Sequence, residues 1–124
     1  MQNNPIAWFE IYVQDLERAK KFYEHVFDIT LQPLSPPFPG IELLAFPADM
    51  NQYGATGALV KMQGHTPTGN STLVYFKCTD CAVEQALVSQ YGGQVQREKM
   101  SIGDYGYIAL VSDTEGNMIG LHSM

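Results

Sequence analysis

The feature that most constrains the fold of this chain is an internal repeat. The two halves of the 124-residue sequence superpose without gaps at a shift of 65 residues, which places Trp8 on Leu73 and Asp15 on Asp80. Few residues are identical, but the order of the predicted elements and the alternation of apolar and polar residues match. Each half alone is too small to bury much core, so the two halves are expected to share one.

The first half begins with a strand and a helix. Residues 8–13 alternate strictly, with Phe9, Ile11 and Val13 on one face. Asp15 then caps a predicted helix, in which apolar residues recur at helical spacing from Leu16 onward. The turn and loop residues that follow separate three further strands, which are predicted near 29–34, 41–46 and 57–62.

The second half repeats this order. Residues 73–78 alternate, Asp80 precedes a helical stretch, and Gly92 and Gly93 end it. That stretch carries Val83, Ala86, Leu87 and Tyr91. Strands are predicted near 94–99, 107–111 and 118–122. The chain is therefore predicted to be a single domain, 1–124, made of two βαβββ units at about 5–62 and 71–123 that are joined by 63–70.

Composition excludes several classes of function. The net charge is −6 and basic residues do not cluster, so a nucleic-acid backbone would be repelled. No stretch approaches the roughly 18 consecutive apolar residues that a membrane span needs. The first residues lack a basic segment followed by an apolar one, and we therefore expect a cytoplasmic protein.

The two cysteines, Cys78 and Cys81, form one C-x-x-C sequence. It lacks the second pair of ligands that a structural zinc site requires. A redox motif would place a cysteine at the start of a helix, as Cys81 is predicted to be. The alternative is one cysteine buried in a strand and one at a helix start, with no redox role.

Two motifs carry a resemblance to a known family. The opening FEIYVQDLERAKKFY at 9–23 and the closing turn DTEGN at 113–117 resemble the vicinal oxygen chelate superfamily. That superfamily includes glyoxalase I, the extradiol dioxygenases and the bleomycin and fosfomycin resistance proteins. The resemblance covers about residues 5–123. Within the superfamily, the chain is similar to a glyoxalase-related branch without an assigned reaction. It implies an α+β fold in which two tandem βαβββ units form a cupped, eight-stranded mixed sheet, with helices outside and a small-molecule site inside.

Alternation predicts which side chains line that cup. The apolar face of each first strand should pack under its helix, so the mixed face points into the cup. On these grounds Glu10 is a candidate general base, and His122 a candidate acid or orienting group. The alternative is that Glu10 only satisfies its own charge by bonding to His122, Lys77 or a tyrosine hydroxyl. The predicted ligand-contacting residues are Trp8, Tyr12, Tyr53, Tyr75, Lys77, Tyr107 and Met118, although any one aromatic residue could instead fill the core.

The resemblance also implies where a metal would bind. Metal-dependent members carry a ligand on the first and last strands of each unit. Three of these ligand positions correspond here to Trp8, Leu73 and Gly120. The fourth lies within 56–61, where the candidates are glycine, alanine, leucine and valine. None of these side chains coordinates a divalent metal. A relocated site using Glu10 and His122 lacks a third ligand. No metal or other cofactor is therefore expected.

Two functions remain open. One is a metal-independent lyase or isomerase that acts on a small carbonyl or hydroxy-acid compound. The other is a non-catalytic protein that sequesters a small aromatic or cationic ligand such as an antibiotic. In both, the partner is a small molecule. The resemblance also suggests a homodimer, for which the exposed edges of an open sheet give a physical reason.

Overall fold

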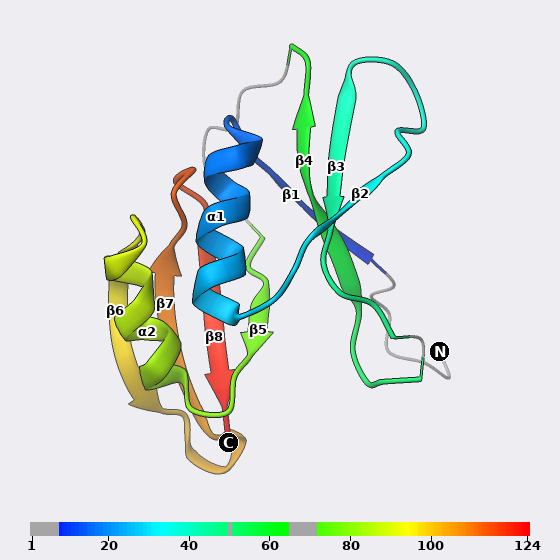
Figure 1. Cartoon of the computed structure of the whole chain (residues 1–124). Helices are drawn as coiled ribbons and strands as arrows, with labels where there is room; N and C mark the ends of the chain where they lie inside the picture. Colours follow the sequence, from blue (N-terminus) through cyan, green and yellow to red (C-terminus); the bar gives the residue numbers. More distant parts are fainter. Residues whose placement is uncertain (1–7, 50, 65–71) are drawn as a thin grey trace.

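The computed structural model describes residues 8–49, 51–64 and 72–124 (Figure 1). The elements of the first half are β1 (Trp8–Tyr12), α1 (Leu16–Phe27), β2 (Gln32–Leu34), β3 (Ile41–Ala45) and β4 (Thr56–Met62). Those of the second half are β5 (Tyr75–Lys77), α2 (Cys81–Gln90), β6 (Gln94–Ser101), a 3₁₀ turn η1 (Gly103–Tyr105), β7 (Tyr107–Ser112) and β8 (Met118–Ser123). The predicted α+β fold with two βαβββ units is confirmed. Most of the predicted joint, 63–70, lies outside the described residues.

The eight strands form two four-stranded mixed sheets with the same topology. Their orders are β1-β4-β3-β2 and β5-β8-β7-β6. In each sheet the first strand is an edge strand and runs parallel to the last, with Trp8 opposite Thr56 and Tyr75 opposite Gly120. The remaining pairs are antiparallel. The repeat seen in the sequence is thus a repeat of strand order.

Helix α1 is formed as its sequence predicts. The Asp15 side chain accepts a hydrogen bond from the Arg18 backbone N–H at 3.1 Å, which caps the first turn. The helix ends at Asp28, which takes the left-handed conformation at φ 52°. Its buried residues are Ala19, Phe22, Tyr23 and Val26. In the described part of the chain, no helix has the length and apolar composition needed to cross a membrane.

Helix α2 packs on the core through a stripe that is only partly apolar. Val83 is 57% exposed, whereas Cys81 and Val88 are fully buried. The inward stripe is Cys81, Glu84, Gln85 and Val88, which follows i, i+3, i+4, i+7 spacing but contains two polar residues. The rotation is fixed at the first turn, because the Cys81 N–H donates to the Ser123 hydroxyl at 3.1 Å. Of the apolar residues named from the sequence, Leu87 packs against the core, whereas Val83 is exposed.

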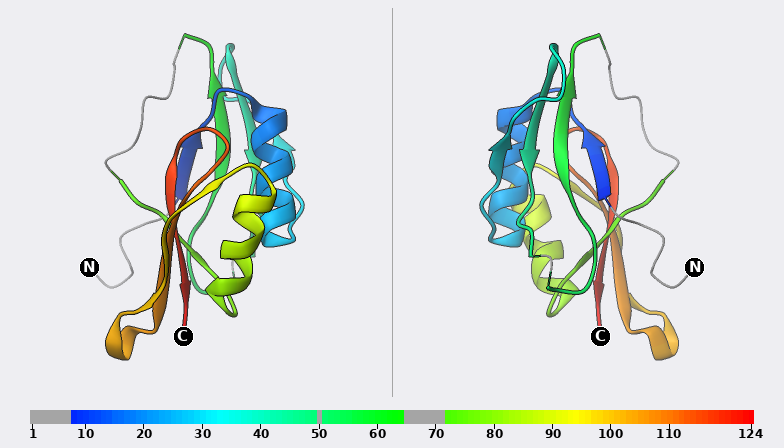
Figure 2. Two further views of the ribbon diagram at one scale, coloured as in Figure 1. Left: turned by 90° about the vertical axis from the view of Figure 1, so that its left-hand side faces the viewer. Right: turned by 90° about the vertical axis from the view of Figure 1, so that its right-hand side faces the viewer.

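Both helices lie on the same side of the sheets, as the two side views show (Figure 2). We call the sheet surfaces that they cover the helix faces and the opposite surfaces the open faces. Residues of both units share the main core on the helix faces, where the predicted Ile11, Ile119 and Leu121 are buried and Phe9 packs against them. A smaller cluster of β3 and β4 residues lies on the open face of the first sheet: Ile41, Leu43, Ala58 and Val60.

The closing turn of the second unit is bonded to the helix start of the first. The buried Glu115 carboxylate accepts hydrogen bonds from the backbone N–H groups of Gln14 and Asp15 and forms an ion pair with Arg18 at 2.7 Å. In the same turn, the buried Asp113 carboxylate accepts a hydrogen bond from the Tyr23 hydroxyl at 2.8 Å. These contacts join segments about 100 residues apart in the sequence.

Candidate binding cavity

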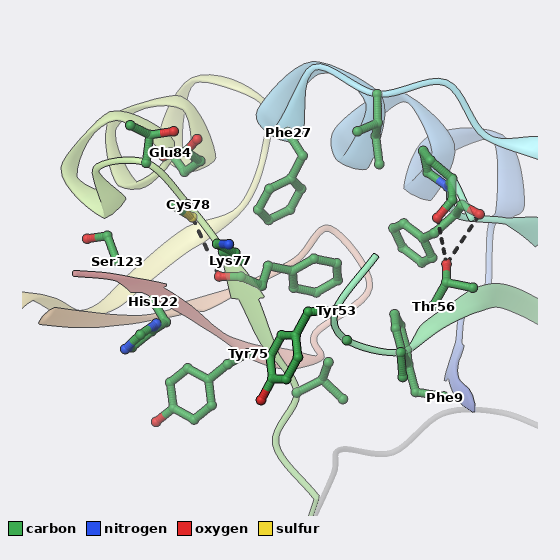
Figure 3. Close-up of a pocket in the computed structure, with 18 of the residues that line it drawn as sticks. Phe9, Phe27, Tyr53, Thr56, Tyr75, Lys77, Cys78, Glu84, His122 and Ser123 are labelled. Atoms are coloured by element: carbon green, nitrogen blue, oxygen red, sulfur yellow. Dashed lines mark hydrogen bonds between the residues drawn. The ribbon is translucent and has the colours of Figure 1, made fainter. Parts of the chain in front are cut away.

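A cavity of about 750 Å³ lies between the two sheets, beside their edge strands β1 and β5. In the close-up, Phe9 and Thr56 of the first unit lie on one side, and Tyr75 and His122 of the second unit lie on the other (Figure 3). The second unit contributes every residue from Val74 to Thr79, so the cavity touches both faces of β5. Neither unit alone provides all of these walls.

Aromatic rings from both units form much of the cavity wall. The ring centroids of Phe9 and Phe76 are 6.0 Å apart, and those of Phe9 and Phe46 are 5.5 Å apart. Phe27, at the end of α1, stacks on Phe76 at 4.6 Å with an interplanar angle of 23°. Ring faces and edges of this kind suit a flat, apolar ligand.

The loop before β4 supplies another wall. Its Tyr53 is 89% exposed and still lines the cavity, and Figure 3 shows its ring between the first and second units. The loop is held at its base by the Thr56 hydroxyl, which donates to the carbonyl oxygens of Pro47 at 2.8 Å and Phe46 at 3.3 Å. A rigid base and an exposed aromatic residue place Tyr53 where it can cover a ligand.

The polar groups of the cavity gather at the second unit. Lys77 and His122 are cross-strand neighbours on the open face of β5 and β8. On the helix face, burial raises the pKa of the Cys78 thiol to about 12, and the charge of the neighbouring Glu84 carboxylate is the next cause. Cys78 therefore stays protonated near neutral pH and is a poor nucleophile. Both cysteines are free and buried, which disfavours the redox interpretation of the C-x-x-C sequence.

The structure brings together four of the predicted site residues: Tyr53, Tyr75, Lys77 and His122. Glu10 is not among the residues that line this cavity. It is exposed on the open face of β1, where its carboxylate accepts hydrogen bonds from the Trp8 indole N–H at 3.3 Å and the Tyr12 hydroxyl at 3.0 Å. A bond to a tyrosine hydroxyl is the contact that the structural alternative for Glu10 expects.

Four other predicted residues do not line the cavity: Trp8, Tyr12, Tyr107 and Met118. Trp8 and Tyr12 lie on the same face of β1 as Glu10 and bond to its carboxylate. Tyr107 is opposite Ser123 on the helix face of its sheet, and its ring packs under the Lys99 ammonium at 4.6 Å from the centroid. The prediction that Tyr107 lines the cup was therefore wrong, because Ala109 and Val111 of the same strand face must pack against the helices. Met118 lies on the open face but does not line this cavity.

The positions at which related proteins would carry metal ligands do not fit a metal here. Trp8 and Leu73 have no coordinating atom, and Gly120 has no side chain. A Cβ atom built on Gly120 would lie 2.2 Å from the Tyr75 ring, so that ring occupies the space into which a ligand side chain would extend. Among the described residues, no group of three His, Cys, Asp or Glu residues is placed to hold a metal ion.

Alternation in the sequence did not identify the cavity residues on the helix faces, chiefly Phe9, Phe76, Cys78 and Glu84. Phe9, Phe76 and Cys78 alternate as core residues, and each does contact the main core. They also reach the cavity because β1 and β5 are edge strands, with no further strand to cover them. The sequence feature that could have placed Glu84 on the inward side of α2 is its i+3 spacing from Cys81.

The family comparison agrees with this architecture. The model of the Glyoxalase/Bleomycin resistance protein/Dioxygenase superfamily matches residues 5–121. The chain belongs to this superfamily. A comparison with curated proteins by sequence finds no match.

Solved structures of superfamily members share the fold. TnmS3, an antibiotic-binding protein from Streptomyces sp. CB03234, is 26% identical with a TM-score of 0.69, and the match covers 99% of this chain and 98% of that one. Glyoxalase I from Leishmania major is 18% identical with a TM-score of 0.74, covering 98% and 87%. Glyoxalase I from Zea mays is 20% identical with a TM-score of 0.71, covering 96% of this chain but only 46% of that one. The chain thus spans about half the length of the Zea mays enzyme.

Proposed function

We propose that this superfamily member is a binding protein that holds a small, planar, largely apolar molecule in the cavity between its two sheets. The observation that carries the proposal is the aromatic wall to which both units contribute, with rings of Phe9, Phe27, Phe46 and Phe76 packed together beside Tyr53. Flat ligands gain from contact with such rings both by burial of apolar area and by ring stacking.

The similarity to TnmS3 supports the same proposal. That protein is described as antibiotic binding, and it matches this chain over nearly the full length of both. An antibiotic or another aromatic compound would suit a cavity of about 750 Å³, a size typical of small-molecule sites. We therefore favour sequestration over catalysis.

A second function, a lyase or isomerase acting on a small carbonyl or hydroxy-acid compound, is favoured by one observation. His122 lines the cavity, where an imidazole can exchange a proton with a ligand. The base proposed for that reaction, Glu10, does not line the cavity and bonds instead to Trp8 and Tyr12. An assay showing turnover that is lost in a His122→Gln variant would support this second function over simple binding.

Two further proposals concern assembly and cofactors. We propose that the protein is metal-independent, which metal analysis of protein purified without chelator would check.

We also propose a homodimer, because bulky apolar side chains are exposed in both units. They are Trp8, Leu34 and Phe38 in the first unit and Leu73, Tyr75 and Met118 in the second.

The proposed function can be tested by mapping a neutral aromatic probe onto the protein. In ¹H–¹⁵N NMR spectra, 2-naphthylmethanol should shift the backbone signals of 53–56, 75–79 and 122–124, which border the cavity. Signals from the outer surface of α1, such as those of Lys20 and Lys21, serve as the internal control. Shifts confined to other surfaces, or no shift at millimolar probe, would contradict the proposal.

A further inference from the structure

Glu84 is a charged residue on the inward side of a helix. It belongs to the stripe of α2 that also contains Cys81, Gln85 and Val88 and packs toward the second sheet. The other polar member of the stripe is satisfied, because the Gln85 side-chain oxygen accepts a hydrogen bond from the Lys99 backbone N–H at 2.7 Å. Glu84 is different: its Oε1 atom is buried and has no hydrogen-bond partner in the described structure. Buried polar atoms of this kind call for an explanation.

The groups around Glu84 do not neutralise its charge. Both salt bridges found among the described residues lie elsewhere, between Arg18 and Glu115 and between Lys99 and Asp80. The neighbouring Cys78 is an uncharged thiol with a pKa raised to about 12, chiefly by burial and also by the charge of Glu84 and a hydrogen bond to its carboxylate. A neutral thiol can satisfy one carboxylate oxygen but does not balance the charge. The positive end of the helix dipole favours the ionised carboxylate, since Glu84 lies in the first turn of α2. Within the described part of the chain, the Glu84 carboxylate therefore has no counter-ion.

Glu84 also borders the cavity. It lies at the end formed by the second unit, near Cys78 and Ser123 and away from Phe9 (Figure 3). The cavity thus has an aromatic region and, at the opposite end, an anionic group. Lys77 and His122 of the lining are cross-strand neighbours on the other face of β5 and β8 from Cys78. Rotation about the terminal torsion of glutamate is soft, so either carboxylate oxygen can turn toward a ligand.

We propose that Glu84 binds a protonated amine on an aromatic ligand held in this cavity, so that the ligand class is the cationic aromatic amines. This inference rests on the proposed binding function and adds to it the charge of the ligand and the residue that recognises it. A charge-assisted hydrogen bond in a partly buried site is among the stronger polar contacts available to a protein. The aromatic region holds the body of the ligand and Glu84 selects its charged end.

The test compares two probes that differ in one group, 2-naphthylmethylamine and 2-naphthylmethanol, by calorimetric titration at neutral pH. The wild-type protein should bind the amine at least about tenfold more tightly than the alcohol. In a Glu84→Gln variant the preference should fall to about twofold or less, while affinity for the alcohol changes little. A Glu98→Gln variant removes the same charge from an exposed position on β6 and should keep the full preference.

The outcomes separate this inference from the proposed function. If the alcohol binds and the amine binds no more tightly, or if Glu84→Gln keeps the preference, Glu84 does not recognise a cation and only the inference fails. If both glutamate variants lose the preference equally, the effect comes from net charge and the inference again fails. If neither probe binds the wild-type protein, the proposed function fails and the inference fails with it.

Discussion

At the scale of single residues, Glu115 connects the two units. Its carboxylate accepts hydrogen bonds from Gln14, Asp15 and Arg18 in the first unit and from the Thr114 hydroxyl beside it. Burial alone would raise the pKa of Glu115, but these donors, above all Arg18, outweigh it and lower the pKa to about 2. The family motif that includes this residue therefore has a structural explanation.

A Glu115→Gln variant should reveal this connection through its dependence on pH. Because the folded pKa lies below the ordinary value of 4.5, the ionised carboxylate stabilises the wild type above about pH 4.5, and that stabilisation is lost as the pH falls toward 2. The variant should unfold with a free energy about 3 kcal/mol lower at pH 7, and the difference should shrink steadily below pH 4.5. Urea denaturation, followed by circular dichroism at a series of pH values, measures this difference in unfolding free energy. A difference that is constant between pH 7 and pH 3 would contradict the assignment.

Single residues also show how far alternation in the sequence can be used. It correctly placed Ile11, Ile119 and Leu121 on the helix faces, because a face that packs under a helix must be apolar throughout. It placed Glu10 on the open face but gave no information on its partners. Those depend on side-chain rotamers, which let Trp8 and Tyr12 reach the carboxylate from two residues away on either side.

At the scale of elements, the helices differ in how well the sequence predicted them. The start signals of both were informative, since Asp15 and Asp80 are the N-caps. The buried side of α1 was clear from its apolar spacing, whereas α2 has apolar residues around much of its circumference. Its rotation is decided by tertiary contacts such as the one between Cys81 and Ser123, which no local pattern contains.

The observed rotation of α2 predicts opposite results for two valines on the same helix. Val88→Asp places a charge where the side chain is fully buried and should lower the free energy of unfolding by about 3 kcal/mol or more. Val83→Asp changes a residue that is 57% exposed and should alter the free energy of unfolding by only about 0.5 kcal/mol. Thermal denaturation of the two variants measures both effects. Equal losses, or a larger loss at Val83, would contradict the observed rotation of α2.

At the scale of the whole molecule, the cavity depends on how two sheets are placed relative to each other. The repeat predicted both sheets and their shared core, because each unit repeats the same pattern. It did not predict that the edge strands β1 and β5 leave the rings of Phe9 and Phe76 accessible from the side. That placement is set by contacts between the units, including the aromatic cluster and the Glu115 hydrogen bonds.

The proposed homodimer is a prediction at this scale. Apolar side chains such as Trp8 and Leu34 are exposed, and a second copy would bury them. Sedimentation equilibrium at micromolar concentration should therefore give twice the mass of one chain. A Leu34→Glu variant should shift the distribution toward monomer, whereas Glu98→Gln on β6 should not. Only monomer for the wild type would contradict the dimer and leave the cavity of the single chain unaffected.

The central claim is that the cavity between the two sheets binds a flat aromatic molecule, and the most direct test is to fill it. Ala55 lines the cavity, and Ala48 belongs to the same loop but does not; both are exposed. Calorimetric titration with 2-naphthylmethanol should show at least about tenfold weaker binding to Ala55→Trp than to the wild type and unchanged binding to Ala48→Trp. Equal affinities for the wild type and Ala55→Trp, or no binding by the wild type, would contradict the claim.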